Sequence, residues 1–171
     1  HPGLSRLTDA EIRDEFDRTQ DGVDRALGYH YPMRFYRPPY GDPFFSKRSD
    51  ALEQQQRICR VVDEREGILM LWRIHGGDGR EGFTVDGMLE YMKPQLYRDF
   101  GGPLVLHDTS QTTTDGLVVI IRRLKRRQFK FTTVDDLLCQ KYRCTPNELV
   151  MLPTIERSSR DERRVVIGAD I

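Results

Sequence analysis

Short apolar runs alternate with longer amphipathic segments along most of this chain. Four runs have the length of a β-strand: residues 34–36 (RFY), 67–72 (GILMLW), 103–108 (PLVLHD) and 130–134 (KFTTV). Segments with apolar residues at helical spacing precede or separate them, at residues 8–28, 47–64, 84–99 and 115–127. Because unbroken apolar runs are typical of strands buried on both faces, the alternation predicts an α/β fold with right-handed crossovers and a parallel sheet or barrel.

The segment 8–28 is the most clearly marked helix. Thr8 and Glu11 have the spacing of a capping box, and Gly28 supplies a stop. The side chains expected on the inner face of this helix are Ile12, Phe16, Val23 and Leu27; in the segments 47–64 and 84–99 they are Leu52, Ile58, Val62, Val85, Leu89, Met92 and Leu96.

The composition excludes two classes of partner. The 171 residues suit one domain, and 27 basic side chains balance 27 acidic ones, so no global charge favours nucleic acid. No apolar run approaches the roughly 20 residues of a membrane span. The basic cluster at residues 122–127 is best interpreted as the solvated face of an amphipathic helix.

Polar side chains follow three of the predicted strands. They are Arg37 and Tyr40 after the first strand, His75 and Asp78 after the second, and His107 and Asp108 after the third. In barrels of parallel strands the active site lies at the carboxyl ends of the strands, so these positions predict one pocket.

Three motifs resemble the polysaccharide deacetylases of the NodB-homology family, carbohydrate esterase family 4. They are HPGLSRLTDAEI (1–12), FYRPPYG (35–41), and LVLHDT (104–109) followed by IIRRLKRRQFKFTTVDDLL (120–138). The resemblance implies a distorted (β/α) barrel that is incomplete at its N-terminus. We expect residues 1–138 to form this deacetylase domain and residues 139–171 to be a peripheral extension.

The resemblance also implies a reaction. Such enzymes use a divalent metal, usually zinc with cobalt as an alternative, to remove acetyl groups from N-acetylglucosamine units of chitin, peptidoglycan or related polymers. Family membership further implies a secreted or cell-surface protein. His1 matches one of the family's two metal-binding histidines, whereas the other histidine and the Asp-Asp segment with the general base would lie upstream. Asp135 and Asp136 only superficially resemble that segment, and we expect them in the first turn of a helix.

By resemblance, the Arg-Pro-Pro-Tyr-Gly loop stabilises the oxyanion. The backbone N–H of Tyr40 would donate to it, since Pro38 and Pro39 fix their own φ angles and make the loop rigid. Arg37 would orient the base carboxylate, which is missing from this chain. The bland alternative for the loop is a surface turn with a solvated arginine.

His107 would be the general acid that protonates the leaving amine. Such an acid works best with a pKa near neutrality, and Asp78 is the carboxylate that would tune it. Val105 and Trp72 are expected to line the substrate site, and Asp108 to hold a loop or cap the next turn. Gly79 replaces the tryptophan that forms an apolar wall in the family, so Phe83 or Phe44 would have to substitute. His75 stands where family members often have aspartate and is a weaker candidate for the pocket.

Several alternatives remain open. The chain could be a catalytically inactive relative that binds carbohydrate or a protein, and a copper site at His1 is a remote third hypothesis. We expect a complementary N-terminal segment or self-association to cover the barrel's open edge. Cys139 and Cys144 are spaced for a local disulfide, with three thiols an equal alternative.

Overall fold

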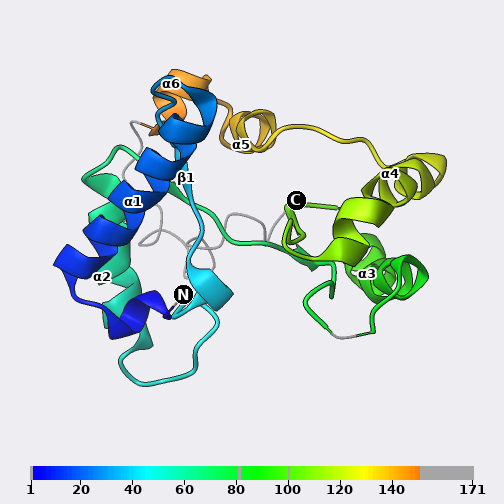
Figure 1. Cartoon of the computed structure of the whole chain (residues 1–171), viewed down its shortest axis with the longest axis horizontal. Coiled ribbons are helices and arrows are strands. Elements are labelled where there is room, and N and C mark those ends of the chain that lie inside the picture. The colour runs from blue at the N-terminus through cyan, green and yellow to red at the C-terminus, as the bar shows by residue number, and fades with distance from the viewer. Residues whose placement is uncertain (1, 81, 100, 151–171) are drawn as a thin grey trace. The chain divides into compact units, whose positions relative to one another are not determined.

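A computed structural model describes residues 2–80, 82–99 and 101–150, which form two compact units (Figure 1). The first unit contains residues 2–71 and 144–150, and the second contains residues 72–143. Among these residues, no helix is both long and apolar enough to cross a bilayer.

The first unit places one parallel strand pair beside two long helices. Its elements are η1 (Leu4–Arg6), α1 (Asp9–Leu27), β1 (Phe35–Tyr36), η2 (Pro39–Gly41), α2 (Ala51–Asp63), β2 (Ile68–Leu69) and α6 (Pro146–Val150). Phe35 pairs with Ile68 and Tyr36 with Leu69, so the predicted parallel pairing of the first two strands is confirmed.

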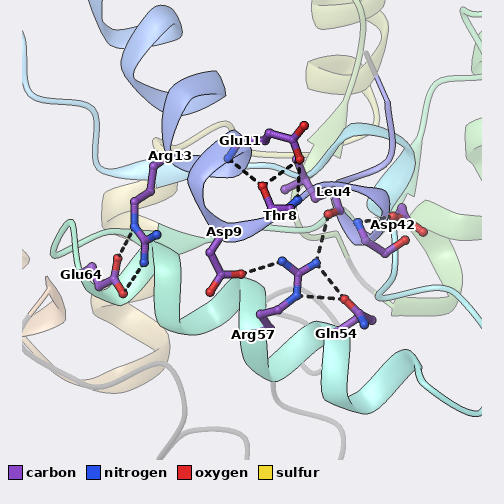
Figure 2. A network of polar contacts seen from close by, with 10 residues as sticks. Leu4, Thr8, Asp9, Glu11, Arg13, Asp42, Gln54, Arg57 and Glu64 are labelled. Atoms are coloured by element: carbon purple, nitrogen blue, oxygen red, sulfur yellow. Dashed lines mark hydrogen bonds and ion pairs between the residues drawn. The ribbon is translucent and has the colours of Figure 1, made fainter.

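Helix α1 begins and ends where its capping residues predict. The Thr8 hydroxyl accepts a hydrogen bond from the Glu11 backbone, and the Glu11 carboxylate accepts one from the Thr8 N–H at 2.7 Å (Figure 2). Gly28 closes the helix in the left-handed region with φ of 77°. The Arg57 guanidinium of α2 then donates to Asp9 at 2.6 Å, which ties the start of α1 to α2.

The core of this unit confirms most of the expected inner faces and corrects two positions. Ile12, Ile58 and Val62 are fully buried. Leu52 is 59% exposed because it lies about 120° around α2 from Ile58, whereas Ala51 shares the buried face. Leu27 is 47% exposed, since it is the last residue of α1 and lies about 22 Å along the axis from Ile12.

The second unit repeats the parallel pairing on a smaller scale. Its elements are β3 (Ile74–His75), α3 (Val85–Asp99), β4 (Leu104–Val105), α4 (Gln111–Arg126) and α5 (Val134–Tyr142). Ile74 pairs with Leu104 and His75 with Val105. The expected inner residues Leu89, Met92 and Leu96 are buried, together with Met88.

The expectation of a barrel is not met within the described residues, whose strands form two separate pairs and not a closed sheet. The predicted strand at 130–134 is wrong. Residues 130–133 pair with no strand, and Thr133 caps α5 through the backbone N–H of Asp136. The residues of segment 130–134 favour a strand, but no neighbouring strand is there to pair with them. The segment instead lines an apolar cavity of about 790 Å³ together with Leu104 and Leu106.

The C-terminal part of the second unit tests two smaller predictions, on the helix start at Asp135 and Asp136 and on the exposed face of α4. Asp135 and Asp136 do occupy the first turn of a helix, and that helix, α5, runs without a break across residue 138. Arg122, Lys125 and Arg126 are exposed on α4, as a solvated face requires. Residues 151–171 of the expected extension lie outside the described residues.

The cysteines remain thiols. Cys139 and Cys144 are not joined by a disulfide, so that alternative is wrong. Burial raises the pKa of the Cys59 thiol to about 12.

Candidate active site

Asp78 and His107 form a pair at the carboxyl ends of β3 and β4. The register that pairs His75 with Val105 brings the two following loops together, and Gly77 adopts a φ of 76° in the turn before Asp78. The His107 backbone N–H donates to Asp78 Oδ2 at 2.5 Å, and His107 Nδ1 lies 3.0 Å from Asp78 Oδ1. We call these two residues the Asp78–His107 pair.

The carboxylate of the pair is buried while the imidazole reaches the surface. Asp78 has no exposed side-chain area, whereas 40% of the His107 side chain is accessible. Burial alone would raise the pKa of Asp78, but hydrogen bonds from the His107 ring, the His107 backbone and the Thr113 hydroxyl outweigh it and hold the pKa below its usual value. Asp78 is therefore ionised at neutral pH and orients the ring through Nδ1.

His75 lies beside this pair, with its ring centroid 6.2 Å from that of His107. Its Nδ1 accepts a hydrogen bond from the Gly77 N–H at 2.8 Å, so the neutral ring carries its proton on Nε2. Burial is the main cause that lowers the pKa of His75, and it outweighs the attraction of Asp78. The Gln95 side chain binds both backbone groups of His75.

The expected substrate-lining residues of this unit lie near the same strand ends. Val105 is buried in β4, and the Trp72 ring lies 6.2 Å from the His75 ring. Phe83 packs edge-on against Tyr91 in this unit, whereas Phe44 packs against the core of the first unit. Nothing lies within 4 Å of a Cβ built on Gly79, so the position of the family's tryptophan is open space.

The structure corrects one of the two roles expected for Asp108, the cap of the next turn, whereas its role in holding a loop stays a prediction. The Asp108 side chain is exposed, and Ser110 caps α4 by accepting from the Thr113 N–H. This cap also explains why α4 begins at Gln111 and not at 115, because Ser110 satisfies an otherwise unpaired amide.

The Arg-Pro-Pro-Tyr-Gly loop belongs to the first unit. Pro38 is buried, Pro39 is partly buried, and Tyr40 holds a φ of 60°, which is uncommon for a residue other than glycine. No described residue accepts a hydrogen bond from the Tyr40 N–H, whereas the next two amides bond to Pro38 and Pro39. Arg37 has an exposed side chain.

Asp42 joins this loop to the start of the chain. Its Oδ2 accepts the Ser5 N–H at 2.9 Å (Figure 2), and a Cβ on Gly3 would lie 2.6 Å from the same oxygen. A Cβ at position 3 would therefore displace the Asp42 carboxylate from this contact. His1, the expected metal ligand, lies outside the described residues.

Sequence reasoning brought Asp78 and His107 together but missed two supporting residues. The Thr113 hydroxyl donates to Asp78 Oδ2 at 2.7 Å, and the Gln95 side chain accepts a hydrogen bond from the His75 backbone N–H in β3. A threonine in the first turn after the LVLHDT motif (104–109) was the available signal for Thr113. Gln95 gave none, because its partner atoms are backbone groups. The convergence of Arg37 and Tyr40 with Asp78 and His107 stays a prediction, since the two sets belong to different units.

Comparison with known proteins agrees with the motifs. The polysaccharide deacetylase family model matches residues 1–58. An uncharacterised 30.6 kDa protein of Geobacillus stearothermophilus is 25% identical over 141 residues, which is 82% of this chain and 49% of that protein. The peptidoglycan-N-acetylmuramic acid deacetylase of Bacillus subtilis is 26% identical over 141 residues, 82% of this chain and 49% of the relative.

A third relative, the peptidoglycan-N-acetylglucosamine deacetylase of Bacillus cereus, is 27% identical over 142 residues, 80% of this chain and 46% of its own length. The chain thus spans about half the length of these relatives. No solved structure is significantly similar to it. Together with the motifs at the strand ends, these matches support a NodB-type polysaccharide deacetylase domain over part of the chain.

Proposed function

We propose that this protein takes part in the hydrolysis of N-acetyl groups from a polysaccharide, with His107 as the general acid. Peptidoglycan is the first substrate to test because relatives named for its deacetylation are similar to the chain, and chitin is the second. The observation that carries the proposal is the Asp78–His107 pair, in which a buried carboxylate orients a solvent-accessible imidazole.

The pair suits the last step of amide hydrolysis. After water adds to the acetyl carbonyl, the C–N bond breaks and the departing amine must take up a proton. Since ionised Asp78 can only accept, it keeps a proton on Nδ1 of His107, and the imidazolium gives its second proton from Nε2 to the amine nitrogen. Such proton transfer accelerates a reaction by about 10²–10⁴-fold.

The loop at residues 37–41 would stabilise the negative charge on the carbonyl oxygen. The Tyr40 N–H suits this role because no described residue accepts a hydrogen bond from it, and the proline-rich backbone around it is rigid. Arg37 would orient a base carboxylate, and Val105 and Trp72 would line the acetyl site. These roles rest on the resemblance, and so does the proposal that the domain belongs to a barrel.

The described residues do not fit a metal ion by themselves, because no three of their His, Cys, Asp or Glu side chains are grouped to hold one. Dependence on zinc or cobalt, with His1 as one ligand, remains part of the proposal. Secretion or cell-surface location and a complementary segment are likewise proposed from the family alone.

A second candidate is a module that binds carbohydrate or protein without hydrolysis. The open space at Gly79 favours it, because the apolar wall expected against the acetyl group is absent at that position.

Acetate release tests the proposal. The 171-residue chain is incubated with N-acetylated peptidoglycan fragments and chitin oligomers, with and without added zinc. Because the general base is expected on an upstream segment, the chain is tested alone and with that complementary segment supplied. We expect acetate when the segment is present, and a loss of about 10²-fold or more in His107→Ala.

The control is His30→Ala. His30 also pairs with an aspartate, Asp24 at 2.6 Å, but lies exposed in the first unit, so its loss should leave the rate unchanged. Equal rates for His107→Ala and the wild type would overturn the acid assignment. Binding of these glycans without any acetate would favour the non-hydrolytic module.

A further inference from the structure

We infer that Thr113 is a positioning residue, whose hydroxyl locks the Asp78 carboxylate in the orientation that aligns His107. The inference rests on the proposed function, since it assigns a purpose to the alignment of the general acid. It starts from three hydrogen bonds that meet on one buried carboxylate.

Two different elements hold the two oxygens of Asp78. Oδ2 accepts the Thr113 hydroxyl at 2.7 Å and the His107 backbone N–H at 2.5 Å, and Oδ1 faces His107 Nδ1 at 3.0 Å. His107 follows β4, whereas Thr113 is the third residue of α4. The carboxylate is thus bound from the strand end and from the helix start.

Burial increases the cost of losing the hydrogen bond between Thr113 and Asp78. Thr113 is 4% exposed and Asp78 is 5% exposed, so water does not readily replace a lost donor at this site. The terminal torsion of aspartate is broad and sets no sharp preference of its own. Two donors on Oδ2 therefore fix the plane of the carboxylate, and with it the direction in which Oδ1 meets the ring of His107.

The start of α4 is built to present this hydroxyl. Ser110 caps the helix through the Thr113 N–H, which fixes the Thr113 backbone. At Gly116, one turn further on, a Cβ would lie 2.2 Å from Val85 Cγ2, so α4 approaches the start of α3 closely there. The position of Thr113 is therefore set on both sides along the helix.

Among the described residues, His75 lies beside the pair, Arg80 and Tyr91 lie near His75, and Asp108 follows His107 in the chain. His75 stays neutral at pH 7 because burial lowers its pKa, and its Nδ1 is already occupied by the Gly77 N–H. The Arg80 guanidinium lies over the Tyr91 ring, 4.5 Å from its centroid. Asp108 is exposed to solvent. Thr113 is the uncharged contact of Asp78 from α4.

The test compares Thr113→Val, which keeps the shape but removes the hydroxyl, with Thr113→Ser, which retains it. Thr114→Val is the matched control, because Thr114 is the next residue of α4 and its hydroxyl binds only the Gln111 carbonyl. The first readout is the titration of the Asp78 side-chain carboxyl followed by ¹³C NMR. It needs no enzymatic activity.

We expect Thr113→Val to raise the pKa of Asp78, since a hydrogen bond to the ionised form is lost. Thr113→Ser should restore the wild-type titration, and Thr114→Val should not change it. An unchanged Asp78 titration in Thr113→Val would overturn the inference. Should Thr113→Val not fold, as judged by circular dichroism, Thr113→Ala is titrated instead and the same rise is expected.

The second readout is acetate release. We expect Thr113→Val to lower kcat about tenfold or more with little change in KM, and Thr113→Ser to recover most of it. A raised Asp78 pKa with an unchanged kcat would limit Thr113 to a structural role and overturn the positioning claim. If the wild type releases no acetate even with the complementary upstream segment supplied, the proposed function fails, while the NMR result still decides whether Thr113 fixes Asp78.

Discussion

At the residue scale, Gly79 offers the most direct change to the candidate site. A Cβ there would meet no atom of the described residues within 4 Å, and the φ of Gly79 does not lie in the left-handed region that favours glycine. We therefore expect Gly79→Trp to fold with a melting temperature close to that of the wild type. If the indole supplies the apolar wall that the family resemblance implies, the variant should also lower KM for N-acetylated glycans. A strongly lowered melting temperature would show that the site is not open.

His75 provides a pH test in the same unit. Burial lowers its pKa below 6.5, so the unfolded chain binds this proton more readily than the folded chain. The free energy of unfolding therefore carries the full contribution of neutral His75 above about pH 6.5. This contribution is lost as the pH falls through the pKa that His75 has in the folded chain. Asp78, with its pKa below 3.8, adds a second loss only in stronger acid.

Urea unfolding at pH 7.5 and pH 5 measures this effect. We expect His75→Asn, which keeps an acceptor for the Gly77 N–H but does not titrate, to be less sensitive to this pH change than the wild type. His30→Asn serves as the exposed control in the first unit. The same pH dependence in His75→Asn and the wild type would contradict the assignment.

At the element scale, glycines in two helices predict opposite effects. A Cβ on Gly116 would lie 2.2 Å from the stiff side chain of Val85, so Gly116→Ala should destabilise the protein by about 1–3 kcal/mol. Gly22 lies in α1 with nothing within 4 Å, and Gly22→Ala should stabilise it by about 0.5–1 kcal/mol. Denaturant unfolding checks both. If Gly116→Ala and Gly22→Ala changed the free energy of unfolding equally and in the same direction, the close contact between α3 and α4 would be contradicted.

The elements also explain what the sequence could predict. The capping box at Thr8 and the Gly28 stop are local signals, so α1 was predicted to the residue. The segment 130–134 has the composition of a strand, but a strand needs a partner backbone that composition cannot supply. Leu52 was misassigned because it lies about 120° around α2 from Ile58, off the buried face that Ala51 shares.

At the scale of the whole molecule, the predicted site divides between two units. Asp78 and His107 were paired through the family resemblance. In the structure Asp78 follows β3, a strand that the sequence analysis did not predict, and β3 lies parallel to and beside β4. Arg37 and Tyr40 follow a strand whose own partner is β2, in the first unit. No local pattern in the sequence relates one strand pair to the other, so their convergence stays a prediction.

Thiol reactivity reports on the opening of the first unit. Cys59 is 2% exposed and its pKa is about 12, so it should react with Ellman's reagent only when this unit unfolds. Cys144 is partly exposed and should react in the native state. Comparing Cys59→Ala with the wild type in native buffer and in urea separates Cys59 from Cys139 and Cys144, which are both partly exposed. Rapid native-state labelling of Cys59 would contradict the packed core described for this unit.

The central claim is that Asp78 and His107 act as one proton-transferring unit. The most direct measurement is acetate release from N-acetylated peptidoglycan fragments by the wild type, Asp78→Asn, His107→Ala and the double variant. Residues that act as a unit are not additive, so we predict that the double variant is no slower than His107→Ala alone. Losses that multiply in the double variant, or a wild-type rate in His107→Ala, would contradict the claim.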